Sequence, residues 1–501
     1  MNITLRRVVP VFALAVAIGH APPAKASQQR FVVDLASDPA SLDPQLQWDP
    51  DSYAVYRNVF DNLVTRDPSG KIVGQVASTW HYKSPTEVMF TIRNDIRFQD
   101  GSKLTPADVV FSIQRITNPA FKSPQLSQLD EIASAAVTGS NQVTITTKTP
   151  YPVLLAQLVK LSIVPKTYVQ KLGNTKFNEH PMGSGPYRFV SRVQGVKIDL
   201  AANEGYWRGK PPFARVVMHP VLQESTRIAD VRTGKADITR ILSTDDANAL
   251  RSDKQVKVLW TPTERVTMLA LNALSGPMQD IRVREAAAMA IDKTVLVKAL
   301  LSGYAKPVNE PLTPASFGFD PNIPDYGYNP VRARELLKEA GVTPQTKFVF
   351  LTSPVFDQRV VQALQQMLAN VGINAKIVTV DLATYLHMRE GRPKQAGDVS
   401  FFRWSCGCED ADGTLFPLFN SSSVWAKYKN LTVDKLLSDA RATLDPKKRI
   451  ADYAQALAII HKDVPVVPLY QDVVMFVARN QVQFQPTADE SFFLFSMGWK
   501  K

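Results

Sequence analysis

The chain has 501 residues, of which 45% are hydrophobic and 21% charged, a balance that is ordinary for globular proteins. Its formal net charge is +12, but the basic residues are scattered, and no aromatic-interleaved basic stripe or DNA-binding motif accompanies them. Composition therefore argues against nucleic-acid binding. Beyond the N-terminal segment, no apolar run reaches the ~18 residues that a membrane span requires.

Residues 1–26 have the pattern of an export signal. Two arginines at 6–7 precede an apolar stretch at 8–19 that is too short for a bilayer of ~30 Å, and Ala-Lys-Ala at 24–26 forms a small-x-small cleavage site. We predict a cleaved signal peptide over 1–26, exported by the Sec route. A buried N-terminal helix, the alternative, would have to tolerate three prolines. Because no cysteine lies near the cleavage point, we expect a freely diffusing periplasmic protein without a lipid anchor.

A strand, a tight turn and a capped helix follow one another closely in the first quarter of the chain. Residues 88–93 alternate apolar and polar side chains, and Asp-Gly at 100–101 supplies a turn with positive φ. Thr105 is a predicted N-cap, with Pro106 at the first helical position and Asp108 three residues after the cap. Similar alternation of short strands and amphipathic helices along the chain predicts an α/β protein. Helices after Asn329 and Asp445 have their apolar residues at core spacing.

Enzyme motifs are missing from the sequence. There is no nucleophile elbow, zinc-binding H-E-x-x-H pair, phosphate loop or dinucleotide fingerprint, and the six histidines include no i, i+4 pair. Gly-Ser-Gly at 183–185 indicates a close-packed backbone crossover. We therefore expect no enzyme and no cofactor.

Both cysteines, Cys406 and Cys408, lie in an acidic, glycine-rich loop at 403–413. A disulfide between them is available in an oxidising compartment, although so small a ring is strained. Alternatively, two reduced thiols line a wall as small apolar residues. These two interpretations stay open, beside a third that invokes a metal.

A metal site in this loop would use the spacing of an EF-hand. Asp410, Asp412 and Gly413 match positions three, five and six of that motif. Cys408 and Phe419 fall at positions one and twelve, where the motif needs oxygen ligands. The sequence therefore predicts no metal.

The strand, turn and helix at 90–112 resemble the signature of the family 5 extracytoplasmic solute-binding proteins of ABC importers, the group of oligopeptide, dipeptide, nickel and opine binders. Further motifs of that family follow in its order, at 41–44, 59–63, 77–80, 181–187, 206–211, 233–238, 280–284, 290–292, 328–330, 340–341 and 465–470. Together they cover most of the chain.

The resemblance implies a two-lobed periplasmic-binding-protein fold of type II, similar to cluster C, with an extra inserted domain. Segments 266–272 and 465–477 are the expected crossing strands of a two-strand hinge. The implied domains are lobe I at 27–65, 185–266 and 480–501, an inserted subdomain at 66–184, and lobe II at 267–479.

The resemblance also implies a ligand site at the cysteine loop. Family members place an aromatic residue there, which Trp404 matches, followed by an acid that holds the ligand's positive end. Gly407 stands where dipeptide and oligopeptide binders have aspartate, and the nearest acids are Glu409 and Asp410. This departure puts recognition of a peptide amine in doubt. The two acids, with Cys406, Gly407 and Cys408, are candidate ligand contacts, or the acids cap the turn that follows.

Trp48 and Asp49, just past the motif at 41–44, are candidate contacts from the facing lobe. Alternatively, Trp48 packs on the inserted domain. The resemblance implies a periplasmic, monomeric solute-binding component of an ABC importer, which captures a peptide-like or opine-like solute between two lobes and delivers it to the inner-membrane permease. A secreted enzyme or a periplasmic chaperone on the same fold is the alternative.

Overall fold

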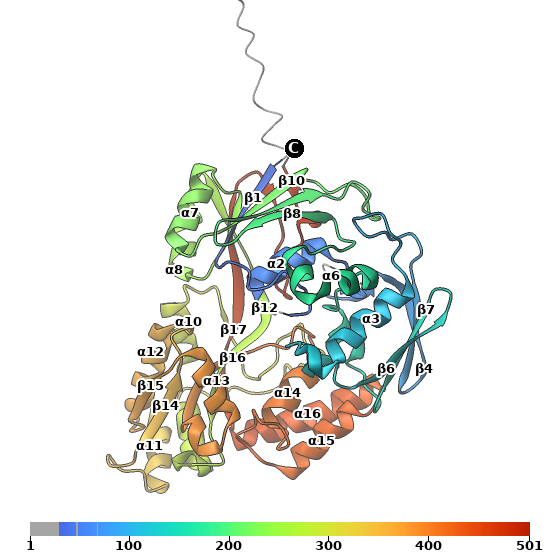
Figure 1. The fold of residues 1–501 in the computed structure, drawn as a ribbon. Coiled ribbons are helices and arrows are strands. Elements are labelled where there is room, and N and C mark those ends of the chain that lie inside the picture. The colour runs from blue at the N-terminus through green and yellow to red at the C-terminus, as the bar shows by residue number, and fades with distance from the viewer. Residues whose placement is uncertain (1–29, 47–48, 68, 501) are drawn as a thin grey trace, which may run out of the picture.

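Two long neighbouring strands join the two lobes of the molecule (Figure 1). The computed structural model describes residues 30–46, 49–67 and 69–500. In it, β12 (Val256–Leu271) and β17 (Val466–Arg479) pair antiparallel inside an eleven-stranded sheet of order β15-β14-β16-β12-β17-β11-β1-β10-β9-β8, with β13 on β17. The predicted crossing strand at 266–272 is thus the second part of a strand that begins at Val256.

In the upper lobe in Figure 1, β1 is flanked by two strands, β10 and β11, that both run parallel to it. Its elements are β1 (Arg30–Leu35), α2 (Pro50–Val59), α6 (Lys166–Glu179), β8 (Tyr187–Val193), β9 (Lys197–Ala202), β10 (Arg215–Pro220), α7 (Glu224–Thr233), β11 (Ile238–Ile241) and α8 (Thr244–Ala249). Side chains of β1 alternate, so Phe31 and Val33 pack in one core and Val32 in another. The C-terminal tail, with β18 (Val482–Gln483) and β19 (Gly498–Trp499), packs on the same core as Phe31.

The insert is a separate antiparallel sheet of order β4-β5-β7-β6, at the right of Figure 1. Its elements are β4 (Ala77–Ser84), β5 (Glu87–Ile92), α3 (Pro106–Thr117), α4 (Leu126–Leu129), β6 (Ile132–Gly139), β7 (Gln142–Thr147) and α5 (Leu154–Leu158), beside a hairpin of β2 (Val64–Arg66) and β3 (Ile72–Gly74). The predicted strand, turn and helix are confirmed. Gly101 has φ of 88°, and the carboxylate of Asp108 accepts from the backbone N–H of Thr105 at 2.9 Å.

The lower lobe places helices around the parallel strands β14 and β16. Its elements are α9 (Ile281–Met289), α10 (Lys293–Leu300), β13 (Lys306–Pro307), α11 (Pro330–Glu339), β14 (Phe348–Thr352), α12 (Gln358–Ala369), β15 (Ala375–Thr379), α13 (Leu382–Glu390), β16 (Val399–Trp404), α14 (Asp412–Phe419), α15 (Leu431–Arg441) and α16 (Pro446–Asp463). Asn329 caps α11 and Asp445 caps α16, as predicted. Tyr453, Leu457 and Ile460 of α16 are buried in the core.

Asp61 lies at the centre of a buried cluster that ties three of the family motifs together. Its carboxylate accepts hydrogen bonds from Gln75 Nε2 (2.6 Å), Ser184 Oγ (2.9 Å), Tyr206 Oη (2.9 Å) and Trp207 Nε1 (3.1 Å). Burial raises the pKa of Asp61, and the hydrogen bonds from the indole and the two hydroxyls oppose that rise. These motifs therefore form the joint between the upper lobe and the insert.

A second buried charge, Asp43, joins the loop after β1 to α3. Arg115 Nη2 lies 2.5 Å from Asp43 Oδ2 and its Nη1 lies 3.0 Å from Oδ1, with side chains 5% and 0% exposed. The guanidinium also donates to Gln45 and Asn174 and lies over the ring of Phe121. The paired charges thus have most of their hydrogen-bonding capacity satisfied away from water.

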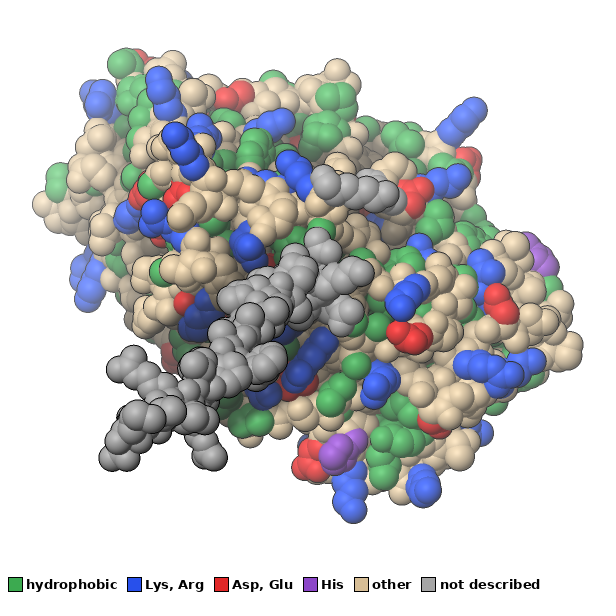
Figure 2. All heavy atoms as spheres, turned by 90° about the horizontal axis from the view of Figure 1, so that it is seen from above, with side chains coloured by type: hydrophobic (Ala, Val, Ile, Leu, Met, Phe, Trp, Pro, Cys, Tyr) green, Lys and Arg blue, Asp and Glu red, His purple; other side chains and the backbone are tan. Residues whose placement is uncertain are grey.

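The surface seen in Figure 2 mixes basic side chains with acidic, hydrophobic and neutral ones, without a continuous basic patch on that face. Within the described part of the chain, every helix is too short or too polar to cross a bilayer. The predicted signal peptide lies outside the described residues, and the domain boundaries stay a prediction.

Candidate functional site

The carboxyl ends of the parallel strands of both lobes open on one cavity of about 520 Å³ beside the hinge. Leu242 and Ser243, in the loop after β11, line it from the upper lobe, and Val355 and Phe356, in the loop after β14, line it from the lower lobe. Ligands of open α/β sheets bind outside the carboxyl ends of the strands, and pockets favour domain interfaces. The cavity thus has the position of a ligand site.

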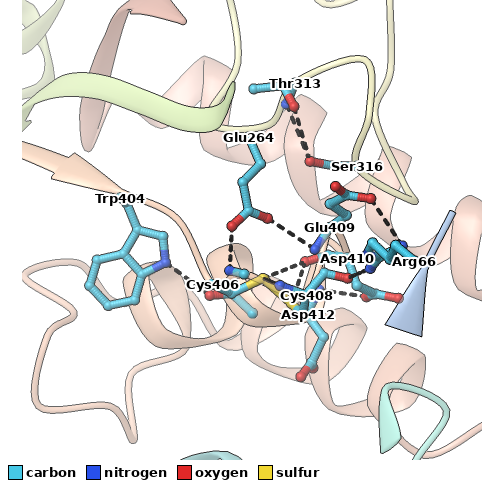
Figure 3. Close-up of a disulfide and its surroundings, with 12 residues drawn as sticks. Arg66, Glu264, Thr313, Ser316, Trp404, Cys406, Cys408, Glu409, Asp410 and Asp412 are labelled. Carbon is cyan, nitrogen blue, oxygen red and sulfur yellow. Dashed lines mark hydrogen bonds and ion pairs between the residues drawn. A yellow bond between two sulfur atoms is a disulfide. The ribbon is translucent and has the colours of Figure 1, made fainter. Parts of the chain in front are cut away.

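The cysteine loop follows β16 and lies on the insert side of the hinge. Cys406 and Cys408 form a disulfide in the structure, with Cα atoms 5.1 Å apart, which is the first of the alternatives that the sequence leaves open (Figure 3). Gly407 between them has φ of 70°, and a Cβ there would lie 2.5 Å from Lys160 Nζ. The backbone conformation therefore favours glycine, and a larger residue would also have to displace the end of the Lys160 side chain.

Glu264, in β12, accepts hydrogen bonds from the backbone of this loop. The N–H of Gly407 donates to one of its carboxylate oxygens and the N–H of Glu409 donates to the other at 3.0 Å, as Figure 3 shows. Burial raises the pKa of Glu264, and Lys160 opposes the rise. Burial also lowers the pKa of Lys160, but Tyr53, Glu264 and nearby acids raise it by more. Hinge, insert and cysteine loop thus meet at one buried group of charges.

The two acids of the loop already have cationic partners within the protein. Glu409 Oε2 lies 2.9 Å from Arg66 Nη1, and Asp410 Oδ1 lies 2.6 Å from Arg449 Nη2. Asp410 also accepts from the backbone N–H of Asp412, the first residue of α14, at 3.0 Å. These contacts hold the loop against the insert and α16. Contact of either acid with a ligand stays a prediction.

The aromatic candidate also braces the loop. Trp404 Nε1 donates to the carbonyl of Gly413 at 2.9 Å, and its ring meets that of Trp425 edge to face with centroids 5.7 Å apart. On the facing lobe, Asp49 caps α2 by accepting from the N–H of Ser52 at 2.8 Å, and Trp48 lies outside the described residues. Ligand contact by Trp404, Trp48 or Asp49 stays a prediction.

Sequence reasoning missed the charged residues of the cavity itself. Arg240, Arg265, Arg403, Asp472 and Glu490 line it from both lobes, the hinge and the C-terminal tail, together with Arg359 and three further acids, Glu224, Asp246 and Asp357. One signal was present in the sequence, because Asp472, beside Gln471, is the only acid inside a mostly apolar predicted strand at 465–477. Among the described residues, no group of three or more His, Cys, Asp or Glu could hold a metal ion.

We expect denatured, unreduced protein to contain no free thiol, since the two cysteines are paired. Replacing both with serine should lower the free energy of unfolding by about 1–2 kcal/mol, because closing so short a loop restricts the unfolded chain little. Thiol titration and urea unfolding measure the two effects. Two free thiols, or a dimer linked by a disulfide, would contradict the pairing.

Glu409 should make stability depend on pH. Burial raises its pKa from 4.5 to about 7, Arg66 opposes the rise, and Glu264 and Asp489 add to it. The folded state thus keeps this proton to a higher pH than the unfolded state, so stability should fall as pH rises from about 4.5 to about 7. Glu409→Gln should remove this part of the slope, on the order of 1–3 kcal/mol, in urea unfolding at several pH values. Exposed Glu335→Gln is the control, and equal slopes in both variants would refute the assignment.

Comparison with known proteins places this architecture in a family. The sequence model described as "Bacterial extracellular solute-binding proteins, family 5 Middle" matches residues 71–425. The glutathione-binding protein GsiB of Salmonella choleraesuis (strain SC-B67) is 30% identical over 487 residues, which cover 94% of this chain and 94% of that protein.

Solved structures agree. The periplasmic binding protein DppA of Helicobacter pylori, in complex with the peptide STSA, superposes with a TM-score of 0.81 at 26% identity and covers 94% of this chain and 98% of its own. CtaP of Listeria monocytogenes, at 20% identity, shares the fold with a TM-score of 0.86 and covers 94% and 99%. These relatives are binding proteins and not enzymes. The chain belongs to family 5 of the bacterial extracellular solute-binding proteins.

Proposed function

We propose that this protein is the periplasmic receptor of an ABC importer, which captures a small peptide-like or opine-like solute between its lobes and delivers it to the inner-membrane permease. The observation that carries the proposal is the cavity of about 520 Å³, lined from both lobes beside the two-strand hinge. A solute that contacts both lobes binds the closed state better than the open one, and that difference drives closure.

We also propose that the protein is a monomer that diffuses freely without a lipid anchor, and that residues 1–26 are cleaved on export. Osmotic shock should release it in soluble form with a mature chain starting near Ser27, as measured by intact mass. Protein that stays in the membrane pellet would contradict this part of the proposal.

Mass spectrometry of the freshly purified protein under native conditions tests solute capture directly. We expect a small molecule bound in a 1:1 ratio, released on denaturation. Calorimetry with reduced glutathione and the peptide STSA, the ligands named for relatives, should give saturable 1:1 binding for at least one of them. No co-purified molecule and no binding of either probe would refute the proposal.

The same samples separate the alternative functions. A secreted enzyme on this fold would convert the probe to a product during incubation. A periplasmic chaperone would bind unfolded chains weakly and without selectivity. The proposed receptor returns its probe unchanged and does not retain an unfolded reference protein.

A further inference from the structure

The hinge contains a wide bulge that faces the cavity. Between two regular parts of the ladder, residues 263–265 of β12 stand opposite Asp472 alone on β17. Thr263 Oγ1 donates to the carbonyl of Asp472 at 3.1 Å, so the irregular segment is held in place. Bulges are frequent beside binding sites because they turn side chains in new directions. Here Arg265 and Asp472 both line the cavity.

Asp472 is a mostly buried acid with one buried oxygen, Oδ2, that is an unused acceptor. Its side chain is 14% exposed, and Oδ1 accepts from Thr267 Oγ1 at 2.9 Å. No described residue donates a hydrogen bond to Oδ2, and its ion-pair partner, Arg403 Nη1, is 3.7 Å away. Burial raises the pKa of Asp472, while Arg403 and Arg265 oppose the rise. A buried carboxylate normally has its oxygens hydrogen-bonded, so this one is suited to a donor from a ligand.

Three of the four arginines that line the cavity lie around the bulge and contact two of the cavity's five acids. Arg240 from the upper lobe and Arg265 from the hinge share Glu490, at 2.8 and 3.1 Å. The Nε atoms of both arginines are buried and have no hydrogen-bond partner among the described residues. Arg403, from the lower lobe, has the long contact to Asp472 as its single ion pair with the described residues. Guanidinium groups bind carboxylates in two-pronged geometry, so this set is suited to an anionic ligand group.

Apolar side chains form the rest of the wall. Phe356, Phe401, Tyr470 and Met475 line the cavity between the charged residues. A volume of about 520 Å³ holds a small solute whose apolar part contacts these side chains. The cavity thus offers an acid, an apolar wall and several arginines in one space.

We propose that side chains at the hinge bind the charged groups of an amino-acid-derived zwitterion, such as a short peptide or an opine. Asp472 takes the ammonium group, and Arg265, with Arg240 and Arg403, takes a carboxylate. The acids of the cysteine loop are less suited to the ammonium group, because their ion pairs with Arg66 and Arg449 are at 2.9 and 2.6 Å, whereas that of Asp472 is at 3.7 Å. This inference rests on the proposed function and specifies its solute class and contacts.

Calorimetry with matched pairs of probes tests the inference. Reduced glutathione and the peptide STSA are each titrated in free form and with the amine acetylated, which removes the positive charge. Wild-type protein should bind the free amine about 10–100-fold more tightly, the range for a charge-assisted hydrogen bond. Asp472→Asn should lose this preference and bind the acetylated probe as the wild type does. Arg265→Gln should weaken both forms by a similar factor.

Glu409→Gln is the matched control, because it neutralises the competing acid of the cysteine loop. It should keep the preference for the free amine. Loss of the preference in Glu409→Gln, or equal binding of free and acetylated probes by the wild type, would overturn the inference and leave the proposed function intact. Failure of every probe to bind, together with the absence of a co-purified small molecule, would overturn both. Equal binding of the free and acetylated probes by the wild type would refute the inference even if Asp472→Asn does not fold.

Discussion

Replacing Asp61 with alanine is expected to lower the free energy of unfolding by on the order of 4 kcal/mol or more, since it leaves four buried donors without their acceptor. Each unsatisfied buried group costs about 1–3 kcal/mol, and few single substitutions exceed about 4 kcal/mol. Urea unfolding should show the loss as a lower midpoint at similar slope.

Asp61→Asn refines this experiment. The amide keeps the shape of the side chain but replaces one acceptor oxygen with a donor, so it should fall between wild type and Asp61→Ala. The exposed Asp95→Ala is the control and should change stability by less than about 1 kcal/mol. If Asp61→Ala were as stable as this control, the hydrogen bonds that join the motifs at Asp61 would contribute little to the stability of the fold.

Arg115→Met should destabilise the protein by about 3–5 kcal/mol, because Asp43 stays buried without its partner. The double variant Asp43→Asn with Arg115→Met should be more stable than the single one, since it removes the isolated charge. Thermal and urea unfolding measure both. Lys435→Met, which breaks the exposed pair with Asp439, should change stability by about 0.5 kcal/mol or less. Similar losses for Arg115→Met and Lys435→Met would contradict this account.

Local features of the fold were predictable because a few neighbouring residues determine them. The turn at Gly101, the cap at Thr105 and the helix starts at Asn329 and Asp445 need only a positive φ, an N-cap side chain or a proline at the right spacing. The resemblance to family 5 added the lobes and the hinge, which no local pattern specifies.

The candidate site was harder to predict because its contacts join distant segments. The sequence pointed to the cysteine loop, but the partners of that loop, Arg66, Lys160 and Glu264, come from the insert and the hinge. Asp472 and Arg265 meet only through the register of β12 on β17, which the alternation of side chains does not determine across a bulge. The redox state of the cysteines was likewise open, since spacing alone allows both states.

The bulge at residues 263–265 also limits how this protein can evolve a preference for a different solute. Its three side chains serve different purposes: Thr263 holds the crossing strands together, Glu264 binds the cysteine loop and Arg265 lines the cavity. A substitution there changes the stiffness of the hinge and the chemistry of the pocket together. The loops after β11 and β14 line the same pocket without belonging to the crossing strands. We therefore expect related receptors to differ in solute preference through these loops, while the bulge changes slowly.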